Sequence, residues 1–306
     1  MDPDVSVMFT VSGPFLIRHS DTIAHLSPEF NKKNHDEFDV HIESIWEKRR
    51  LENPKLFNGT KFRLHSVSHE SNGPGCKTTF NLGITCYRDF ISTNWAPNAE
   101  DILRKGEQDY NNTQAFMSDA MGVGALVQTT DNHVIFLKRS IHCGEAKGLW
   151  DIPGGHAEPQ ELVGDLPVEN IDVTKMDPVK VIEEMFDSIK REVIDEVNIP
   201  SSCLSEPELC GIARNTTAAG RPSVEFVIRC SLNSEEVKAK YHQGNQSEAD
   251  ESTSICLLPL ETVIKMKSED EFWQNMAPSA KGCIILYRLY DTKVTDLGQT
   301  DLDNDV

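Results

Sequence analysis

The chain has 306 residues, 38% of them hydrophobic and 26% charged, which is typical of a soluble globular protein with one large domain or two modest ones. Its 49 acidic and 30 basic residues give a net charge of −19 at pH 7. This charge argues against nucleic acid or an anionic membrane as a partner, because both need a basic surface. A small phosphate-bearing ligand stays possible if metal ions and a few local cations reverse the sign inside the site.

The 8 cysteines are spread along the chain without a C-x-x-C pair, so zinc-ligand spacing is missing and we expect no disulfide framework. The first residues, Met1-Asp2-Pro3-Asp4, lack the basic region of a signal peptide, and no apolar run approaches membrane-spanning length. We therefore expect an intracellular protein, in the cytoplasm, with the nucleus left open. The sequence does not indicate an oligomeric state.

The first 115 residues are predicted to form a small α+β domain. Alternating apolar residues predict a strand at 5–12. An amphipathic helix and then two strands, separated by the turn-forming Ser71-Asn72-Gly73-Pro74-Gly75, are expected at 41–53, 61–69 and 77–87. A second helix is expected at 98–109, after Pro97.

Residues 116–290 are predicted to form the second domain. Apolar strands at 121–129 and 133–139 are joined by Thr130-Asp131-Asn132, a good hairpin turn. Further strands are expected at 208–214, 223–231 and 253–258, and helices at 178–198, 234–242, 260–266 and 279–290. Residues 291–306 are acidic and nearly free of apolar anchors, so we expect a disordered tail there.

The expected helix at 178–198 carries a group of carboxylates. Asp177 suits the N-cap and Pro178 the first helical position. Since successive residues turn by about 100°, Glu192 and Glu196 project about 40° apart, and Asp195 lies on the other side of Glu192. Such carboxylates repel one another unless a cation joins them, and oxygen ligands at this spacing suit Mg²⁺ or Mn²⁺. On helix spacing alone a solvated acidic helix face is the preferred interpretation, so the metal interpretation needs support from elsewhere in the chain.

That support comes from the residues before the helix. Gly154-Gly155 followed by Arg191-Glu192-Val193-Ile194-Asp195-Glu196 resembles the Nudix box, in which a glycine precedes a helix that ends R-E-U-x-E-E-x-G-U, where U is aliphatic. The segment Trp150-Asp151-Ile152-Pro153-Gly154-Gly155 resembles the W-x-x-P-G-G segment that is typical of this superfamily. The two parts together are far more specific than either part alone.

The chain departs from the box at two points. About twenty residues are inserted after Gly155, so the glutamate that normally pairs with Arg191 is open between Glu158, Glu183 and Glu184. Projection along the helix favours Glu184 as this partner. The glycine near the helix end is replaced by Asn198, which is a mild change because asparagine tolerates the left-handed conformation.

Over about residues 40–290 the chain resembles the animal UDP-glucose diphosphatase branch of the Nudix superfamily. The segments that carry this resemblance are 61–66, 87–90, 93–95, 153–160, 195–198, 211–215 and 278–282. The resemblance implies an α/β fold, namely a Nudix α/β/α sandwich with a mixed sheet, preceded by a smaller N-terminal α+β domain that helps to hold the nucleotide. It also implies hydrolysis of UDP-glucose and UDP-galactose to UMP and the sugar 1-phosphate with Mg²⁺, for which Mn²⁺ can substitute.

The same resemblance assigns site residues by motif. Glu192 and Glu196 are expected to bind the metal, with Asp195 as a third catalytic carboxylate. The residues expected to line the substrate are Phe57, Tyr87, Arg139, Gly144, Asp151, His156, Glu158 and Ser279.

Chemistry supports these roles but leaves simpler alternatives. Aromatic rings at 57 and 87 suit stacking on uracil, and a guanidinium at 139 suits a phosphate. Residues 151 and 156 suit hydroxyl groups of ribose or sugar, and a helix start at 279 suits an anion. Each residue also has a simpler interpretation. Phe57 and Tyr87 can be core aromatics and Arg139 a surface arginine. Asp151 can be a capping residue, His156 an exposed histidine and Ser279 an N-cap.

Two other functions stay open. One is hydrolysis of a different Nudix substrate, such as ADP-ribose or a dinucleotide. The other is a catalytically silent domain that binds nucleotide sugars or a protein partner, against which the intact carboxylates at 192, 195 and 196 argue. Either Glu158 or Glu192 can be the general base. The sequence also does not decide which of the two phosphorus atoms water attacks, since either gives the same products.

Overall fold

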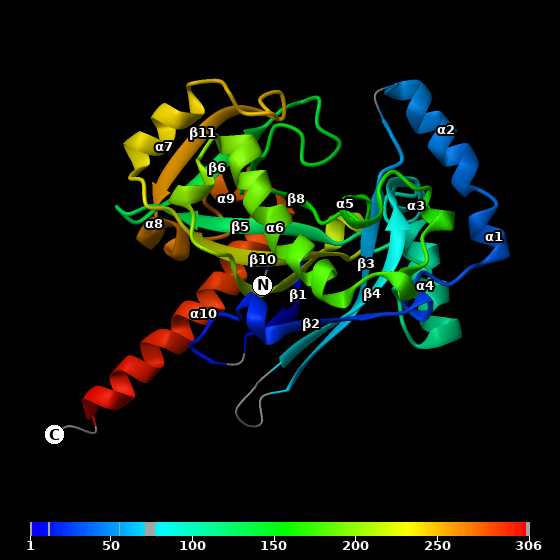
Figure 1. Ribbon diagram of the computed structural model, residues 1–306, viewed down its shortest axis with the longest axis horizontal. Coiled ribbons are helices and arrows are strands. Elements are labelled where there is room, and N and C mark those ends of the chain that lie inside the picture. The colour runs from blue at the N-terminus through cyan, green and yellow to red at the C-terminus, as the bar shows by residue number, and fades with distance from the viewer. Residues whose placement is uncertain (1, 12, 55, 71–76, 304–306) are drawn as a thin grey trace.

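The computed structural model describes residues 2–11, 13–54, 56–70 and 77–303, and it contains two sheets (Figure 1). The larger sheet has eight strands in the order β1-β9-β10-β5-β6-β11, with β7 paired to β6 and β8 paired to β5. These strands are β1 Val5–Thr10, β5 Gly122–Gln128, β6 His133–Arg139, β7 Trp150–Asp151, β8 Gly154–His156, β9 Glu208–Asn215, β10 Arg221–Arg229 and β11 Ser252–Pro259.

The larger sheet is mixed and is covered by helices on both faces. Strands β5 and β10 run parallel, whereas the other pairs in this sheet are antiparallel. Alternate residues of β5 face opposite layers: Val123 and Val127 pack in the core under α6 (Pro178–Val197), and Leu126 packs in the core under α10 (Pro278–Asp303). The expected α/β/α sandwich with a mixed sheet is therefore confirmed.

The smaller sheet has the order β2-β4-β3. Its strands are β2 Thr22–Leu26, β3 Thr60–Glu70 and β4 Lys77–Cys86, and the helices near it are α1 Asp36–Asp39, α2 Ile42–Glu52, α3 Tyr87–Thr93 and α4 Ala99–Tyr110. The predicted helices at 41–53 and 98–109 and the predicted strands at 61–69 and 77–87 are confirmed, while the turn predicted at 71–75 lies outside the described residues. Neither β2 nor α3 was expected, because β2 is only five residues long and Cys86 provides no side-chain cap for α3.

The remaining helices lie along the second half of the chain. They are α5 Gln160–Val163, α7 Ser234–Tyr241, α8 Leu260–Lys265 and α9 Glu271–Gln274. No helix in the described part of the chain combines the length and apolarity that crossing a membrane requires.

Strand β1 comes from the first 115 residues but pairs with β9 of the larger sheet, with Val5 opposite Asn215. The division into domains 1–115 and 116–290 stays a proposal. Helix α10 continues to Asp303, so the structure differs from our expectation of a disordered tail after 290. A helix that already packs at its N-terminal end can extend without a new nucleation step, which explains a helix where apolar anchors are few.

Candidate active site

The carboxylate-bearing helix α6 begins and ends as its sequence predicts. The Asp177 side chain accepts the Val179 N–H at 2.9 Å, which caps the first turn. Asn198 adopts the left-handed conformation with a φ of 64° and closes the last turn. These two residues fix where the helix begins and ends, so that Glu192 and Glu196 fall in its last two turns.

Glu192 and Glu196 are held by the backbone of the short strand β8. The Oε2 atom of Glu196, a residue that is only 4% exposed, accepts the Gly154 N–H at 3.0 Å. The Oε1 atom of Glu192 accepts the His156 N–H at 3.4 Å. Between them, Gly155 has no side chain, and an added Cβ there would overlap the Glu192 carboxylate. Gly155 therefore lets the helix and the strand approach closely enough for these contacts, whereas Gly154 lets β8 lie close to the backbone of β5.

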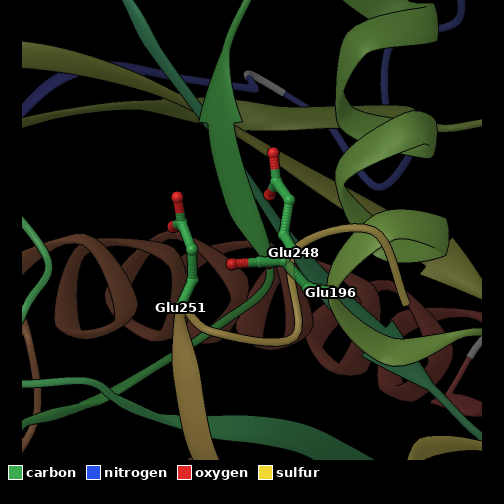
Figure 2. Close-up of side chains that lie close together, drawn as sticks. All are labelled: Glu196, Glu248 and Glu251. Atoms are coloured by element: carbon green, nitrogen blue, oxygen red, sulfur yellow. The ribbon is translucent and has the colours of Figure 1, made fainter. Parts of the chain in front are cut away.

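Two further carboxylates join this pair from the loop at 242–251, between α7 and β11. One oxygen each from Glu196, Glu248 and Glu251 can lie within 4.8 Å of the others (Figure 2). Asp195 holds this loop: its Oδ1 accepts from Ser247 Oγ at 2.6 Å, and its carbonyl accepts the Glu248 N–H at 3.1 Å. The Asp195 carboxylate, although it belongs to α6, therefore binds a residue of this loop.

Ionisation of Glu192 and Glu196 is unfavourable, because both are buried at least in part and lie close to other carboxylates. Burial raises the pKa of Glu196 well above its usual value, and neighbouring Glu192 raises it further. Burial likewise raises the pKa of Glu192, and the negative charge of Glu248 raises it further. Bringing a divalent cation among these groups would offset their mutual repulsion. Because the donors are all carboxylate oxygens, they fit a hard cation such as Mg²⁺ or Mn²⁺.

Glu184 is the partner of Arg191, as projection along the helix predicted. The Arg191 Nη2 atom donates to both Glu184 oxygens, at 2.7 and 2.9 Å. Glu184 Oε1 also accepts the Glu158 N–H at 3.2 Å, so the pair secures the segment that follows β8. Glu183 instead forms an ion pair with Lys180.

Three of the expected substrate residues meet at one side of the site. Ser279, in the first turn of α10, donates through Oγ to Asp151 Oδ1 at 2.8 Å. Arg139 Nη1 lies 3.8 Å from the Asp151 carboxylate, and Arg139 Nε donates to the Glu145 carbonyl at 3.1 Å. The structure therefore brings residues 139, 151 and 279 together.

Of the other expected substrate residues, Phe57 and Tyr87 lie in the N-terminal part of the chain and Gly144 lies in the loop at 140–148, while His156 ends β8 and Glu158 follows it. A Cβ on Gly144 would lie 2.8 Å from the Tyr87 hydroxyl, so this loop passes directly beside α3. Glu158 forms an ion pair with Lys61 of β3. Phe57 is 69% exposed, and its ring lies against Gly59.

His156 has a partner that was not predicted. Arg221, the first residue of β10, lies with Nη1 3.2 Å from His156 Nε2 and 3.1 Å from Glu145 Oε2. The sequence analysis thus missed residues Lys61, Glu145, Arg221, Glu248 and Glu251. Only Lys61 gave a signal, as a lysine inside the otherwise apolar start of a strand; the others come together through long-range contacts.

The chain was compared with known proteins, and no family model matches it. It is 42% identical over 289 residues to uridine diphosphate glucose pyrophosphatase NUDT22 of Bos taurus, covering 94% of this chain and 97% of that protein. The protein with the same description from Homo sapiens is 42% identical over 288 residues, covering 94% of this chain and 93% of that protein. Nudix hydrolase 9 of Arabidopsis thaliana is 32% identical over 267 residues, covering 85% and 83%.

Among solved structures, the MutT protein from Methanosarcina mazei Go1 matches with a TM-score of 0.35 and 18% identity, covering 56% of this chain and 93% of that chain.

Proposed function

The chain belongs to the Nudix family of the uridine diphosphate glucose pyrophosphatases, and we propose that it hydrolyses UDP-glucose and UDP-galactose at the diphosphate linkage. The products are UMP and the sugar 1-phosphate. The observation that carries this proposal is the placement of Glu192 and Glu196 on the backbone of Gly154 and His156, which joins the two separated parts of the Nudix box.

Nudix hydrolases generally use divalent metal ions, and we infer Mg²⁺ for this chain, with Mn²⁺ as a substitute. Glu192 and Glu196 would hold the metal, and Glu248 and Glu251 each have an oxygen within 4.8 Å of an oxygen of Glu196. When bound, the metal neutralises charge on the diphosphate and lowers the pKa of an attacking water. Asp195 supports the metal site without binding the metal, because it anchors the loop that carries Glu248.

The remaining residues bind and orient the substrate. Arg139 takes a phosphate, and its guanidinium lies beside Asp151, which in turn accepts a hydrogen bond from Ser279. Tyr87 and the exposed ring of Phe57 provide faces for the uracil base. Lys61 and Tyr87 support a nucleotide-holding role for the N-terminal domain, since both come from the first 115 residues and lie beside residues of the later part of the chain.

The test is a product assay on a panel of substrates with Mg²⁺. UDP-glucose, UDP-galactose, ADP-ribose and a dinucleotide are incubated with the protein, and the nucleotides released are identified by chromatography and mass spectrometry. We expect UMP from both UDP-sugars at the highest rates. Faster release of AMP from ADP-ribose would favour the other Nudix substrates, and tight UDP-glucose binding without UMP release would favour the silent binding module.

A further inference from the structure

Arg221 occupies a buried place in the site that no assigned role explains. It begins β10, is only 6% exposed, and its guanidinium lies over the Phe90 ring at 5.6 Å from the centroid. Its charge is balanced by Glu145, whose carboxylate lies 3.1 Å away. Because its Nη1 atom is directed at Glu145 and at one neighbouring ring, the role of Arg221 is read from the side chain that it contacts.

That neighbour is His156, whose Nε2 atom lies 3.2 Å from Arg221 Nη1. A guanidinium has only donors, so it can make this hydrogen bond only if Nε2 accepts. A neutral imidazole has one acceptor and one donor nitrogen, so acceptance at Nε2 places the ring proton on Nδ1. A doubly protonated ring would instead turn an N–H toward the guanidinium.

The Nδ1 side of the His156 ring determines what this tautomer can bind. Among the described residues, no hydrogen bond from Nδ1 is found, while the backbone N–H of the same residue is bound to Glu192. The ring therefore holds one unused N–H donor, in a residue whose backbone binds a carboxylate of the proposed metal site.

We propose that Arg221 is a positioning residue that fixes the Nδ1-protonated tautomer of His156, so that this N–H donates to an oxygen of the nucleotide sugar. Glu145 supports this role by neutralising the guanidinium, which leaves Arg221 oriented toward the ring. The inference deepens the proposed function and rests on it for the identity of the substrate. The tautomer itself belongs to the free protein and can be measured without turnover.

The first test is nitrogen NMR of the substrate-free protein with ¹⁵N-labelled histidine at neutral pH. The chain has 10 histidines, so the His156 signals are assigned by their loss in His156→Gln. We expect a protonated Nδ1 and an unprotonated Nε2 in the wild type, and a protonated Nε2 in part of the Arg221→Met molecules. A wild-type ring with its proton on Nε2 would overturn the proposal even if Arg221→Met fails to fold.

The second test is a double-mutant cycle on UMP release from UDP-glucose. Loss of one hydrogen bond to a charged group predicts that Arg221→Met lowers kcat/KM by about 10- to 100-fold, and Arg221→Lys, which keeps a donor, should recover most of it. If Arg221 acts through the ring, adding Arg221→Met to His156→Ala should change kcat/KM less than about twofold. Arg229→Met, at the exposed far end of the same strand, is the matched control and should leave kcat/KM unchanged.

The outcomes separate this inference from the proposed function. Equal losses from Arg221→Met with and without the His156 ring would overturn the inference, because Arg221 would then act independently of that ring, while UMP release would stand. An Nδ1-protonated ring in a protein that hydrolyses no UDP-sugar would overturn the proposed function and the substrate contact of His156 together.

Discussion

A methyl group at position 155 would test the metal site by steric displacement alone. The three heavy atoms nearest to a Cβ built on Gly155 all belong to the Glu192 carboxyl group, the far end of a flexible side chain. The backbone there is outside the left-handed region, so alanine adds no conformational strain. We therefore predict that Gly155→Ala folds normally and moves the Glu192 carboxylate away from its place.

The size of the displacement follows from the contact distances. The farther oxygen, Oε2, would lie 2.8 Å from the new Cβ, inside the ordinary contact distance, and Oε1 would overlap it more deeply. The carboxylate must then move by on the order of 1 Å, and a misplacement of this size can cost about 100-fold in rate. Mg²⁺ tolerates little distortion of its octahedral shell, so more metal should also be needed for half-maximal activity.

The assay is UMP release from saturating UDP-glucose over a Mg²⁺ titration, with thermal unfolding followed by circular dichroism. Gly154→Ala is the matched control, because its Cβ would lie 2.5 Å from the Val123 carbonyl oxygen, a backbone atom that cannot turn aside. We expect it to lower the melting temperature, whereas Gly155→Ala should keep it. Wild-type turnover and Mg²⁺ dependence in Gly155→Ala would refute the placement of Glu192 at the metal.

Three further changes test the supporting structure. Glu184→Ala removes both hydrogen bonds from Arg191 and leaves the Glu158 N–H without its acceptor, so we expect a loss of about 1–3 kcal/mol in urea unfolding; unchanged stability would contradict the pairing. Asn198→Ala should cost about 1–2 kcal/mol because φ is 64° there, and Asn198→Gly should cost clearly less in the same experiment. Burial raises the pKa of Glu225 from its usual 4.5 to about 7, so the folded wild type loses stability as the pH rises through this range. Glutamine stays neutral, so Glu225→Gln should be more stabilising at pH 8 than at pH 5 by up to about 3 kcal/mol, and an equal effect at both values would count against the shift.

The parts of the site that lie on α6 were predictable because they depend on local geometry. An N-cap at Asp177, a left-handed stop at Asn198 and 3.6-residue periodicity set the helix and its carboxylate spacing. The same periodicity selected Glu184 as the partner of Arg191. These features need no knowledge of how distant segments pack.

The parts that were missed depend on tertiary contacts. Glu248 reaches the site because its loop follows α7 and binds Asp195, more than fifty residues earlier in the chain. Arg221 reaches His156 because β10 lies beside β5, to which β8 is also paired. No local pattern marks either residue, since strand order in a sheet is not written in the periodicity of any one strand.

The most direct test of the metal-dependent mechanism compares UMP release from UDP-glucose by the wild type and Glu196→Gln across a Mg²⁺ titration. Glutamine keeps the size of the side chain and can still accept the Gly154 N–H, so the variant should fold and melt like the wild type. We predict Mg²⁺-dependent UMP release by the wild type and loss of most turnover in the variant at every Mg²⁺ concentration. Near-normal turnover in a well-folded Glu196→Gln protein would contradict the assignment of this carboxylate to the metal.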